Sequence, residues 1–364
     1  MKKGIGLVLV LIALAPAIRL GQLGLARHEI DRSSPAWRAR DDALSRARVL
    51  APSRPAAREV PTACVYVSNA THGTTPKFDC RLPDGTTVKV KYGDSPEIPA
   101  EVAATGLLSM LGFPADRMAI IPRLRCFGCP PAPFRLRHVA EWFLASPLVD
   151  LMVDPSHARE FDWSAMEWKF EAPAIEPDGY QGWQWSDLLH VEVSRGGATG
   201  AELDALRLVG VFLADWDNKS ENQRLVCLDE LPPRGAAGAG RLTCQQPLLM
   251  LQDLGATFGP VKLNLEKWRA APIWADAAAC RTDMASLPYR GATFLPVQIS
   301  EAGRVLLAQR LRQITEAQLR ELLTSARFPD PVTGRPDGDV TPWVRVFEEK
   351  VRQIADRPVC PPFR

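Results

Sequence analysis

Apolar and polar positions alternate in the first part of the chain as they do in β-strands. Residues 64–67 form a short β-type run, and residues 77–82 form a second run. In residues 86–92 valines alternate with lysines, which places the two kinds of side chain on opposite faces of a strand. Pro83-Asp84-Gly85 lies between the second and third runs and supplies a hairpin turn, because glycine tolerates the positive φ that such turns need. This part of the chain is therefore predicted to begin with three strands.

A helical period follows the third predicted strand. Apolar side chains fall on one side of residues 99–111, and Gly112 is placed to end the helix. Residues 118–124 indicate another strand. The predicted order is therefore strand, strand, strand, helix, strand.

The second half of the chain has a stronger helical signal. Residues 201–214 carry an apolar face and lead directly into a polar segment, residues 215–222. Two strands are predicted near residues 224–228 and 248–251, and the Pro/Gly/Ala-rich residues 232–240 between them indicate a tolerated insertion. Further helices are predicted at residues 301–312, 316–326 and 342–355. The tryptophan-rich residues 139–193 do not follow a clear period.

The N-terminal residues indicate export. Lys2 and Lys3 precede an uncharged aliphatic run, and Ala15-Pro16-Ala17 offers a small-x-small cleavage site, so that residues 1–18 are predicted to be a signal peptide. An uncleaved signal anchor is the alternative, in which case the protein would stay at a membrane. Residues 19–60 are rich in Arg, Ala, Ser and Pro and are predicted to form a flexible stem.

Composition and charge narrow the class of protein. The net charge of +2 and a pI near 8.1, with acids and bases interspersed, give no basic footprint for nucleic acid. About 300 residues follow the signal and stem, enough for one two-lobed domain or two packed domains. No G-x-S-x-G, H-E-x-x-H or histidine pair at metal-ligand spacing is present in the sequence.

Eight cysteines agree with export, because an even number in an exported chain indicates disulfides. Cys126 and Cys129 form the single C-x-x-C; a zinc site would need a second ligand pair, so a bridge between these two is predicted. A thioredoxin-like role is the alternative. The other predicted pairs are Cys64–Cys80, Cys227–Cys244 and, by elimination, Cys280–Cys360.

Two acidic motifs carry the candidate chemistry. Asp217 and Asn222 are five positions apart, and Lys219 follows the aspartate by two. Downstream, Asp253-Leu254-Gly255 follows an apolar strand. Phosphoryl transfer needs a carboxylate near the attacking hydroxyl and oxygen ligands that hold Mg²⁺ against the phosphates. A D-x-x-x-x-N loop followed by a hairpin and D-x-G provides these groups in order.

With the helix at residues 99–111, these motifs resemble the atypical kinases of the Golgi casein kinase and four-jointed group, and more distantly HipA-type and phosphoinositide-kinase-like folds. The resemblance covers about residues 64–325 and is specific at the metal motifs and the helix. It implies an α+β, bilobal kinase-like fold. Residues 61–138 would form a small β-rich N-lobe with one helix, and residues 139–364 a larger, mainly helical C-lobe.

The resemblance also implies a role for each matching residue. Asp217 would be the catalytic base, Lys219 a transition-state charge partner, and Asn222 and Asp253 the ligands of Mg²⁺ or Mn²⁺. In the N-lobe, the phosphates of ATP would be bound by the residues that match the family pattern there: Lys89 or Lys91, paired with Glu101, and the loop that contains Gly73 and Thr74.

The sequence departs from the family pattern at several points. It has no G-x-G-x-x-G, and Asp215-Trp216 stands where His-Arg usually precedes the catalytic aspartate. Three activities stay open: an extracytoplasmic kinase that transfers the γ-phosphate of ATP to a hydroxyl, an exported pseudokinase that acts as a scaffold, and transfer of AMP. The acceptor could be a protein, a glycan, a lipid or a small molecule.

Overall fold

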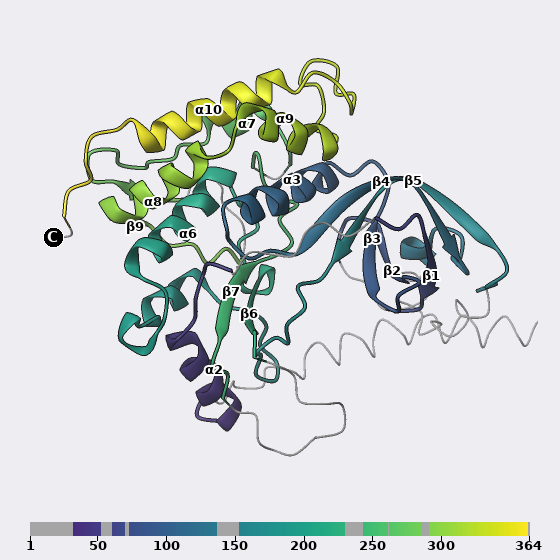
Figure 1. Ribbon diagram of the computed structural model, residues 1–364, viewed down its shortest axis with the longest axis horizontal. Helices are drawn as coiled ribbons and strands as arrows, with labels where there is room; N and C mark the ends of the chain where they lie inside the picture. Colours follow the sequence, from purple (N-terminus) through teal and green to yellow (C-terminus); the bar gives the residue numbers. More distant parts are fainter. Residues whose placement is uncertain are drawn as a thin grey trace, which may run out of the picture. The chain divides into compact units, whose positions relative to one another are not determined.

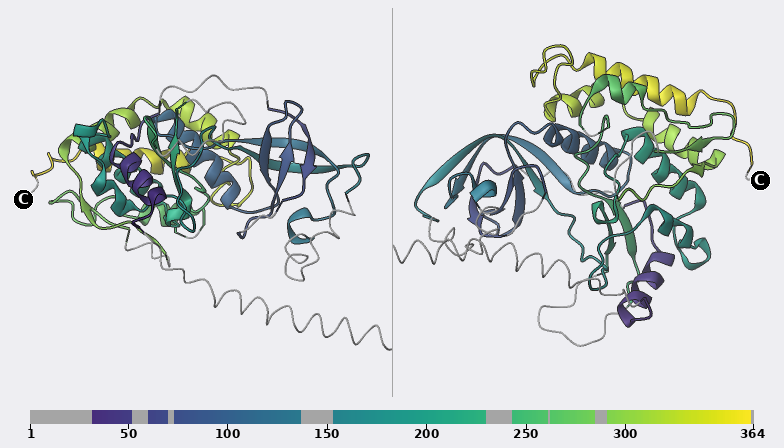
Figure 2. Two further views of the ribbon diagram at one scale, coloured as in Figure 1. Left: turned by 90° about the horizontal axis from the view of Figure 1, so that it is seen from below. Right: turned by 180° about the vertical axis from the view of Figure 1, so that it is seen from behind.

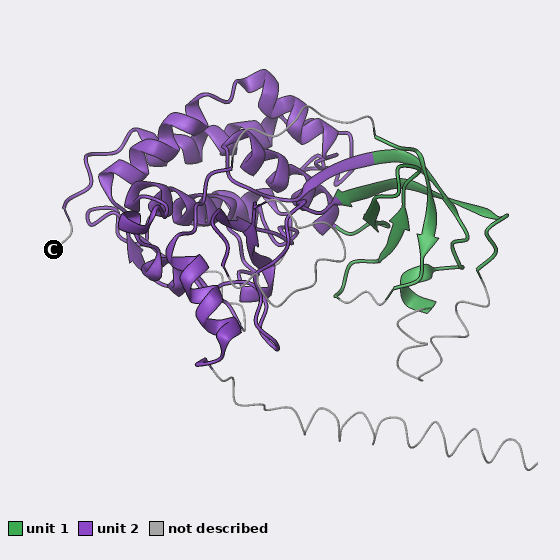
Figure 3. Cartoon of the chain, turned by 60° about the horizontal axis from the view of Figure 1, so that its bottom comes forward, with its two compact units in different colours: residues 1–31, 59–95, 121–167 green, residues 32–58, 96–120, 168–364 purple. Residues whose placement is uncertain are grey.

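The computed structural model describes residues 32–51, 60–69, 73–136, 153–229, 243–260, 262–284 and 291–362 (Figure 1). The predicted signal peptide and the whole predicted insertion at 232–240 lie outside these ranges. The chain is a mixed α and β protein with an antiparallel hairpin and several helices (Figures 1 and 2). It divides into two compact units (Figure 3): unit 1 consists of Met1–Asp31, Glu59–Ser95 and Ile121–Glu167, and unit 2 of Arg32–Arg58, Pro96–Ile120 and Trp168–Arg364.

The strands of unit 1 belong to a closed barrel with the order β1-β2-β3-β5-β4. Its strands are β1 (Ala63–Val67), β2 (Lys77–Arg81), β3 (Thr87–Lys91), β4 (Arg117–Phe127) and β5 (Ala158–Trp168). The first three were predicted, the third of them from its alternation of valine and lysine, and β4 extends the strand predicted at 118–124. β5 lies in the tryptophan-rich segment, where no strand was predicted.

Unit 2 carries most of the helices and a β-hairpin. The helices are α2 (Pro35–Ser45), α3 (Glu97–Met110), α6 (Gly200–Leu213), α7 (Leu265–Ala270), α8 (Glu301–Arg312), α9 (Glu316–Ser325) and α10 (Thr341–Ala355). The strands are β6 (Gln223–Cys227), β7 (Pro247–Leu251), β8 (Arg281–Thr282) and β9 (Val297–Gln298). Short 3-10 helices occupy η1 (Trp185–His190), η2 (Val193–Arg195) and η3 (Ser220–Asn222). α6 packs against α8, and α10 packs against α7, α8 and α9.

Helix α6 is largely buried in unit 2. Its sequence favours both a helix start at its N-terminal residues and burial of its apolar face. Thr199 and Glu202 form a capping box at its N-terminus, an arrangement that satisfies two otherwise unpaired backbone donors. The apolar positions predicted to face the core are buried, among them Leu206, Val209 and Leu213. The prediction of a helix over residues 201–214 is confirmed to within one residue at each end.

The prediction of a flexible stem over residues 19–60 is wrong for residues 35–51. Ser34 caps α2 by accepting a hydrogen bond from the Trp37 N–H at 3.3 Å, and Trp37 and Leu44 are buried. Beyond the helix, Arg48 forms an isolated parallel bridge with Leu248 of β7. The polar composition of this segment gave no sign of the amphipathic helix and the strand-like segment after it, which both belong to unit 2.

Helix α3 groups with unit 2. Residues Pro96–Ile120 belong to unit 2 and Ile121–Glu167 to unit 1, and the predicted boundary of an N-lobe at residue 138 stays a prediction. The buried side of α3 includes three small residues, Ala100, Ala103 and Ala104. Such a surface allows close approach, and α3 packs against α9 of unit 2.

The structure confirms all four predicted disulfides. The bonds are Cys64–Cys80, Cys126–Cys129, Cys227–Cys244 and Cys280–Cys360. Four bonds in one chain indicate an oxidising compartment. No helix within the described ranges combines the length and the apolar character that crossing a bilayer requires.

The two disulfides of unit 2 should differ in how much they stabilise it. Cys280–Cys360 closes a sequence separation of 80 residues and Cys227–Cys244 one of 17 residues. Chain entropy then predicts that removing the first costs about 1.4 kcal/mol more free energy of unfolding than removing the second. Urea unfolding of the two double Cys→Ser variants measures the difference, and equal losses would contradict it.

Candidate functional site

The loop after α6 begins at a reversal of the chain. Ala214 ends the helix in the left-handed region with a φ of 54°, and the Asp215 N–H donates to the Gly210 carbonyl at 3.0 Å. The Trp216 N–H donates to the Ala256 carbonyl, also at 3.0 Å. The loop is therefore attached to α6 and to the segment that follows β7.

The β6–β7 hairpin brings the two predicted metal ligands, Asn222 and Asp253, to the same end of the hairpin. Gln223 pairs with Leu251 in the register of the hairpin. One position further, the Gln252 N–H donates to the Asn222 carbonyl at 2.8 Å. Asp253 is the next residue and has a φ of 52°, and its side chain is exposed. Asn222 and Asp253 are 31 positions apart in the sequence but are neighbours here, because Asn222 is hydrogen-bonded to Gln252 and Asp253 follows Gln252 directly.

Asp217 is joined to the same end of the hairpin. The Asn222 Nδ2 donates to the Asp217 carbonyl at 2.6 Å, so the amide nitrogen is engaged and the amide oxygen is the end available to a cation. The Lys219 Nζ donates to Asp217 Oδ2 at 3.0 Å. The other carboxylate oxygen, Oδ1, is buried and has no hydrogen-bond partner among the described residues. An unsatisfied buried oxygen of this kind fits a site that is completed by a ligand.

Asn218 holds the middle of the loop and was missed by the sequence analysis. Its side chain is buried, and its Nδ2 donates to the Asp215 carbonyl at 2.9 Å. Its Oδ1 accepts from the N–H groups of Thr293 and Phe294, each at 2.9 Å. Because the partners lie about 75 positions away, no local pattern could have identified it.

A third aspartate lies close to the first two. Asp215 is buried, and burial together with the negative charges of Asp217 and Asp253 raises the pKa of its carboxyl from 3.8 to about 7. The charges of Asp217 and Asp253 therefore disfavour the ionised form of Asp215. Clustered acids that repel one another are typical of cation sites, since a bound cation relieves the repulsion.

The raised pKa of Asp215 predicts how stability depends on pH without divalent cations. Between about pH 4 and pH 7 the unfolded carboxyl releases its proton while the folded carboxyl keeps it, so its contribution to the free energy of unfolding falls as the pH rises through this window. An Asp215→Asn variant lacks this loss. Urea unfolding in the presence of a chelator should show its stability, relative to the wild type, growing with pH across the window; a difference independent of pH would contradict this.

In unit 1 the structure separates the two candidate lysines. Lys91 is buried, whereas Lys89 is half-buried. The Lys91 Nζ lies 3.6 Å from Glu167 Oε2, and both side chains are buried. Glu167 was missed because it lies in the tryptophan-rich segment. Its pairing holds Lys91 in one place.

The loop that contains Gly73 and Thr74 lies beside a further lysine. Gly73 has a φ of 102°, and a Cβ built on it would lie 3.0 Å from the Lys77 Nζ. Lys77 is buried and pairs with Lys91 in the β2–β3 register, so the two side chains share a face of the barrel. Thr74 is exposed. The structure thus places Gly73 next to a lysine ammonium, and the sequence analysis missed Lys77.

The acidic face of α3 lies in unit 2. Glu101 is buried, and Glu97 is one turn earlier on the same face. A Cβ on Gly255 of the D-x-G motif would lie 2.9 Å from the Glu97 Cβ, so the first turn of α3 contacts this motif. The predicted pair between Glu101 and a strand lysine joins residues of different units and stays a prediction.

The arrangement can hold a divalent cation. Carboxylate and amide oxygens are the ligands that Mg²⁺ accepts, and it usually takes one or two of them from the protein. Asn222 and Asp253 provide such oxygens at one end of the hairpin, and Asp217 adds a carboxylate whose Oδ1 is unsatisfied among the described residues.

Comparisons with known proteins give similarities of structure but none of sequence. No family model matches the chain, and no curated protein matches it. Among solved structures, a match is found with the crystal structure of a Helicobacter pylori proinflammatory kinase, CtkA, at 10% sequence identity and a TM-score of 0.40, covering 80% of this chain and 93% of that chain.

Proposed function

We propose that this chain is an extracytoplasmic kinase-like phosphotransferase that uses ATP with Mg²⁺ or Mn²⁺ and acts on a hydroxyl. The observation that carries the proposal is the junction at the end of the β6–β7 hairpin. There, Asn222 is hydrogen-bonded to the main chain of both Asp217 and Gln252. Asp253 follows Gln252 directly. One hydrogen-bonded segment would therefore carry the base and both metal ligands that the two motifs imply.

Each side chain has a distinct part in the proposed reaction. A metal held by Asn222 and Asp253 would offset the negative charge of the phosphates. Asp217 would accept the proton of the attacking hydroxyl at Oδ1, the oxygen that is unsatisfied among the described residues. Lys219, 3.0 Å from Asp217 Oδ2, would keep the carboxylate oriented and contribute positive charge.

For the phosphate-binding lysine we favour Lys91. Its burial and its ion pair with Glu167 give it a fixed position, while Lys89 is more exposed. Glu101, Gly73 and Thr74 keep, as predictions, the nucleotide-binding roles that the family resemblance implies. Lys91→Ala should then weaken ATP binding much more than Lys89→Ala.

The disulfides support the extracytoplasmic part of the proposal. Bonds in both units favour an oxidising compartment, where such bonds form and persist. The basic start and aliphatic run of residues 1–18 would supply an export signal, either removed or retained as an anchor.

The test is transfer of the labelled γ-phosphate of ATP by the purified protein with Mn²⁺ or Mg²⁺, using the chain itself, casein-like acidic peptides and glycans as acceptors. Nucleotide should also raise the melting temperature when metal is present, since a ligand that binds only the native state stabilises it. Transfer of label from α-labelled ATP would indicate AMP transfer instead. A shift without transfer to any acceptor would favour the pseudokinase, and no shift with any nucleotide would contradict the proposal.

A further inference from the structure

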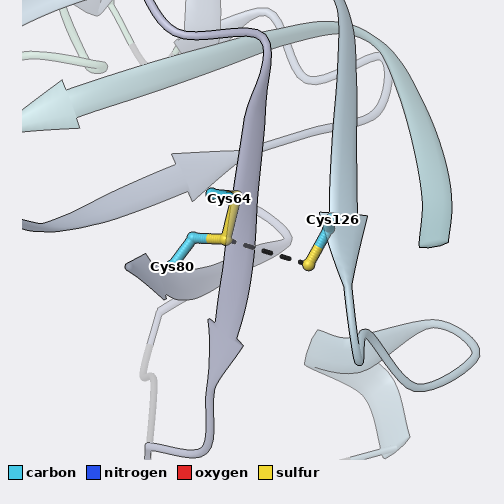
Figure 4. A group of neighbouring side chains, drawn as sticks. All are labelled: Cys64, Cys80 and Cys126. Carbon is cyan, nitrogen blue, oxygen red and sulfur yellow. Dashed lines mark hydrogen bonds between the residues drawn. A yellow bond between two sulfur atoms is a disulfide. The ribbon is translucent and has the colours of Figure 1, made fainter. Parts of the chain in front are cut away.

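Four cysteine sulfurs of unit 1 lie together although they form two separate bonds. β1 and β4 run parallel, and their register places Cys64 opposite Cys126. Cys80 is bonded to Cys64, and Cys129 is bonded to Cys126. The Sγ atoms of Cys80 and Cys126 are 3.8 Å apart (Figure 4). The fold therefore gives the C-x-x-C the second cysteine pair that a zinc site needs.

The spacing of these sulfurs fits a tetrahedral metal. With Zn–S bonds of about 2.3 Å, two ligand sulfurs of a tetrahedron lie about 3.8 Å apart, which matches the distance between Cys80 and Cys126. The ligand atoms of Cys64, Cys80 and Cys126 all lie within 4.8 Å of one another. Cys129 is held beside them by its bond to Cys126.

The surroundings also suit a structural site. All four side chains are buried, with exposed fractions between 0% and 7%. Gly128 turns the chain between Cys126 and Cys129 with a φ of 76°, so both cysteines can approach one centre. The ligands come from three adjacent strands and the turn after β4, which the barrel already holds in place.

We propose that, in the reduced chain, Cys64, Cys80, Cys126 and Cys129 bind one Zn²⁺ in tetrahedral geometry. The strands of the unit 1 barrel are then cross-linked either by two disulfides or by one zinc ion. This inference does not depend on the proposed phosphotransfer.

The change between the two forms balances in electrons and protons. A dithiol reductant supplies two electrons and two protons to each disulfide and becomes a disulfide itself, so two reductant molecules yield four thiols. Zn²⁺ then displaces up to four protons, because thiolates and not thiols are its ligands. The resulting centre carries excess negative charge. Arg159, whose Nε donates to the Cys129 carbonyl at 3.0 Å, lies beside it.

A second cysteine group competes as a zinc site. Cys227, Asp229 and Cys244 also have ligand atoms within 4.8 Å of one another. The two carboxylate oxygens of Asp229 already accept hydrogen bonds from the N–H groups of Gln245 and Gln246, each at 2.9 Å. This group offers three ligand residues, whereas a structural zinc site has four, so the four-sulfur group is the one we assign.

The experiment uses the purified chain without its predicted signal peptide. The protein is reduced with an excess of a phosphine under nitrogen, mixed with at least one equivalent of Zn²⁺ and passed through a desalting column. The zinc that stays with the protein is then measured. Wild type should retain one zinc per chain when reduced and none when oxidised. Co²⁺ in place of Zn²⁺ should give the absorption bands of a tetrahedral thiolate complex. Cys64→Ser/Cys80→Ser should lower zinc affinity at least a hundredfold, whereas the matched Cys227→Ser/Cys244→Ser variant should bind like the wild type.

Two results would overturn the assignment. One is a reduced wild type that retains no zinc. The other is a Cys64→Ser/Cys80→Ser variant that binds zinc as tightly as the wild type, which would mean that the C-x-x-C or the Cys227 group suffices. A reduced chain that unfolds without metal and regains its circular dichroism with one equivalent of zinc, in the wild type but not in Cys64→Ser/Cys80→Ser, would support it. None of these readings involves ATP or phosphate transfer, so they are separate from the test of the proposed function.

Discussion

Replacing Asp253 with alanine should lower the rate of phosphate transfer by about a thousandfold. The proposed metal has Asn222 and Asp253 as its protein ligands, and Asp253 is the charged one. Loss of a preorganised group that stabilises charge in the transition state costs on the order of 10²- to 10³-fold in rate. Single-turnover transfer from labelled ATP, measured at several Mn²⁺ concentrations, gives the rate and the apparent metal affinity together.

The control is Asp178→Ala, because Asp178 is an exposed aspartate of the same unit outside the two motifs. It should transfer phosphate at the wild-type rate. Because Asp253 is exposed, its replacement should leave the chain folded, and circular dichroism of the variant without metal checks that lost activity is not lost folding. An Asp253→Ala variant that retains the wild-type rate at low Mn²⁺ would contradict the assigned role.

Gly182→Ala should destabilise unit 2 strongly and disturb the loop that carries the site. Gly182 has a φ of 71°, and a Cβ on it would lie 1.9 Å from the Ser220 carbonyl oxygen and 2.1 Å from that of Gln223. Neither main-chain oxygen can move without moving Asn222 between them. Backbone strain and overpacking together should cost roughly 2–6 kcal/mol in free energy of unfolding.

Gly179→Ala provides the matched control for this change. Gly179 also has a positive φ, 77°, but a Cβ there would meet nothing within 4 Å. It should therefore lose only the strain contribution, about 1 kcal/mol. Urea unfolding of the two variants separates the terms. Equal losses would show that Gly182 does not pack against the site loop as the structure indicates.

Arg40 shows why this packing could not be read from the sequence. Its Nη2 donates to the Gly182 carbonyl at 3.2 Å and to Asp187 Oδ2 at 2.5 Å, and its side chain is almost wholly buried. In the sequence it lies in the segment rich in Arg, Ala, Ser and Pro that was predicted to be a flexible stem. Its partners are more than 140 positions away, and only the folded chain brings them together.

The motifs were predictable where short-range rules decide the structure. The spacing of Asp217 and Asn222 and the apolar strand before Asp253 identify a loop and a hairpin end, and the hairpin register then makes the two ends neighbours. The disulfides were predictable in part because Cys126–Cys129 and the pairs 16 and 17 residues apart are close in sequence. Once those were assigned, Cys280–Cys360 was the remaining pair.

Other contributions depend on contacts between distant strands. Lys77 becomes a neighbour of Lys91 only through the β2–β3 register, and Glu167 reaches Lys91 only because β5 pairs with β3. The same applies to the four sulfurs, which meet because β1 pairs with β4. Alternation along a strand predicts which face a side chain occupies, but not which strand lies beside it.

The most direct test of the proposed site is a crystal structure with Mn²⁺ and a non-hydrolysable ATP analogue, in which anomalous scattering locates the metal. We expect a manganese ion ligated by Asn222 Oδ1 and a carboxylate oxygen of Asp253, in contact with the phosphates and on the side of Asp217 Oδ1. A nucleotide bound with its metal away from both residues, or the loop and the hairpin end facing different surfaces, would contradict the account.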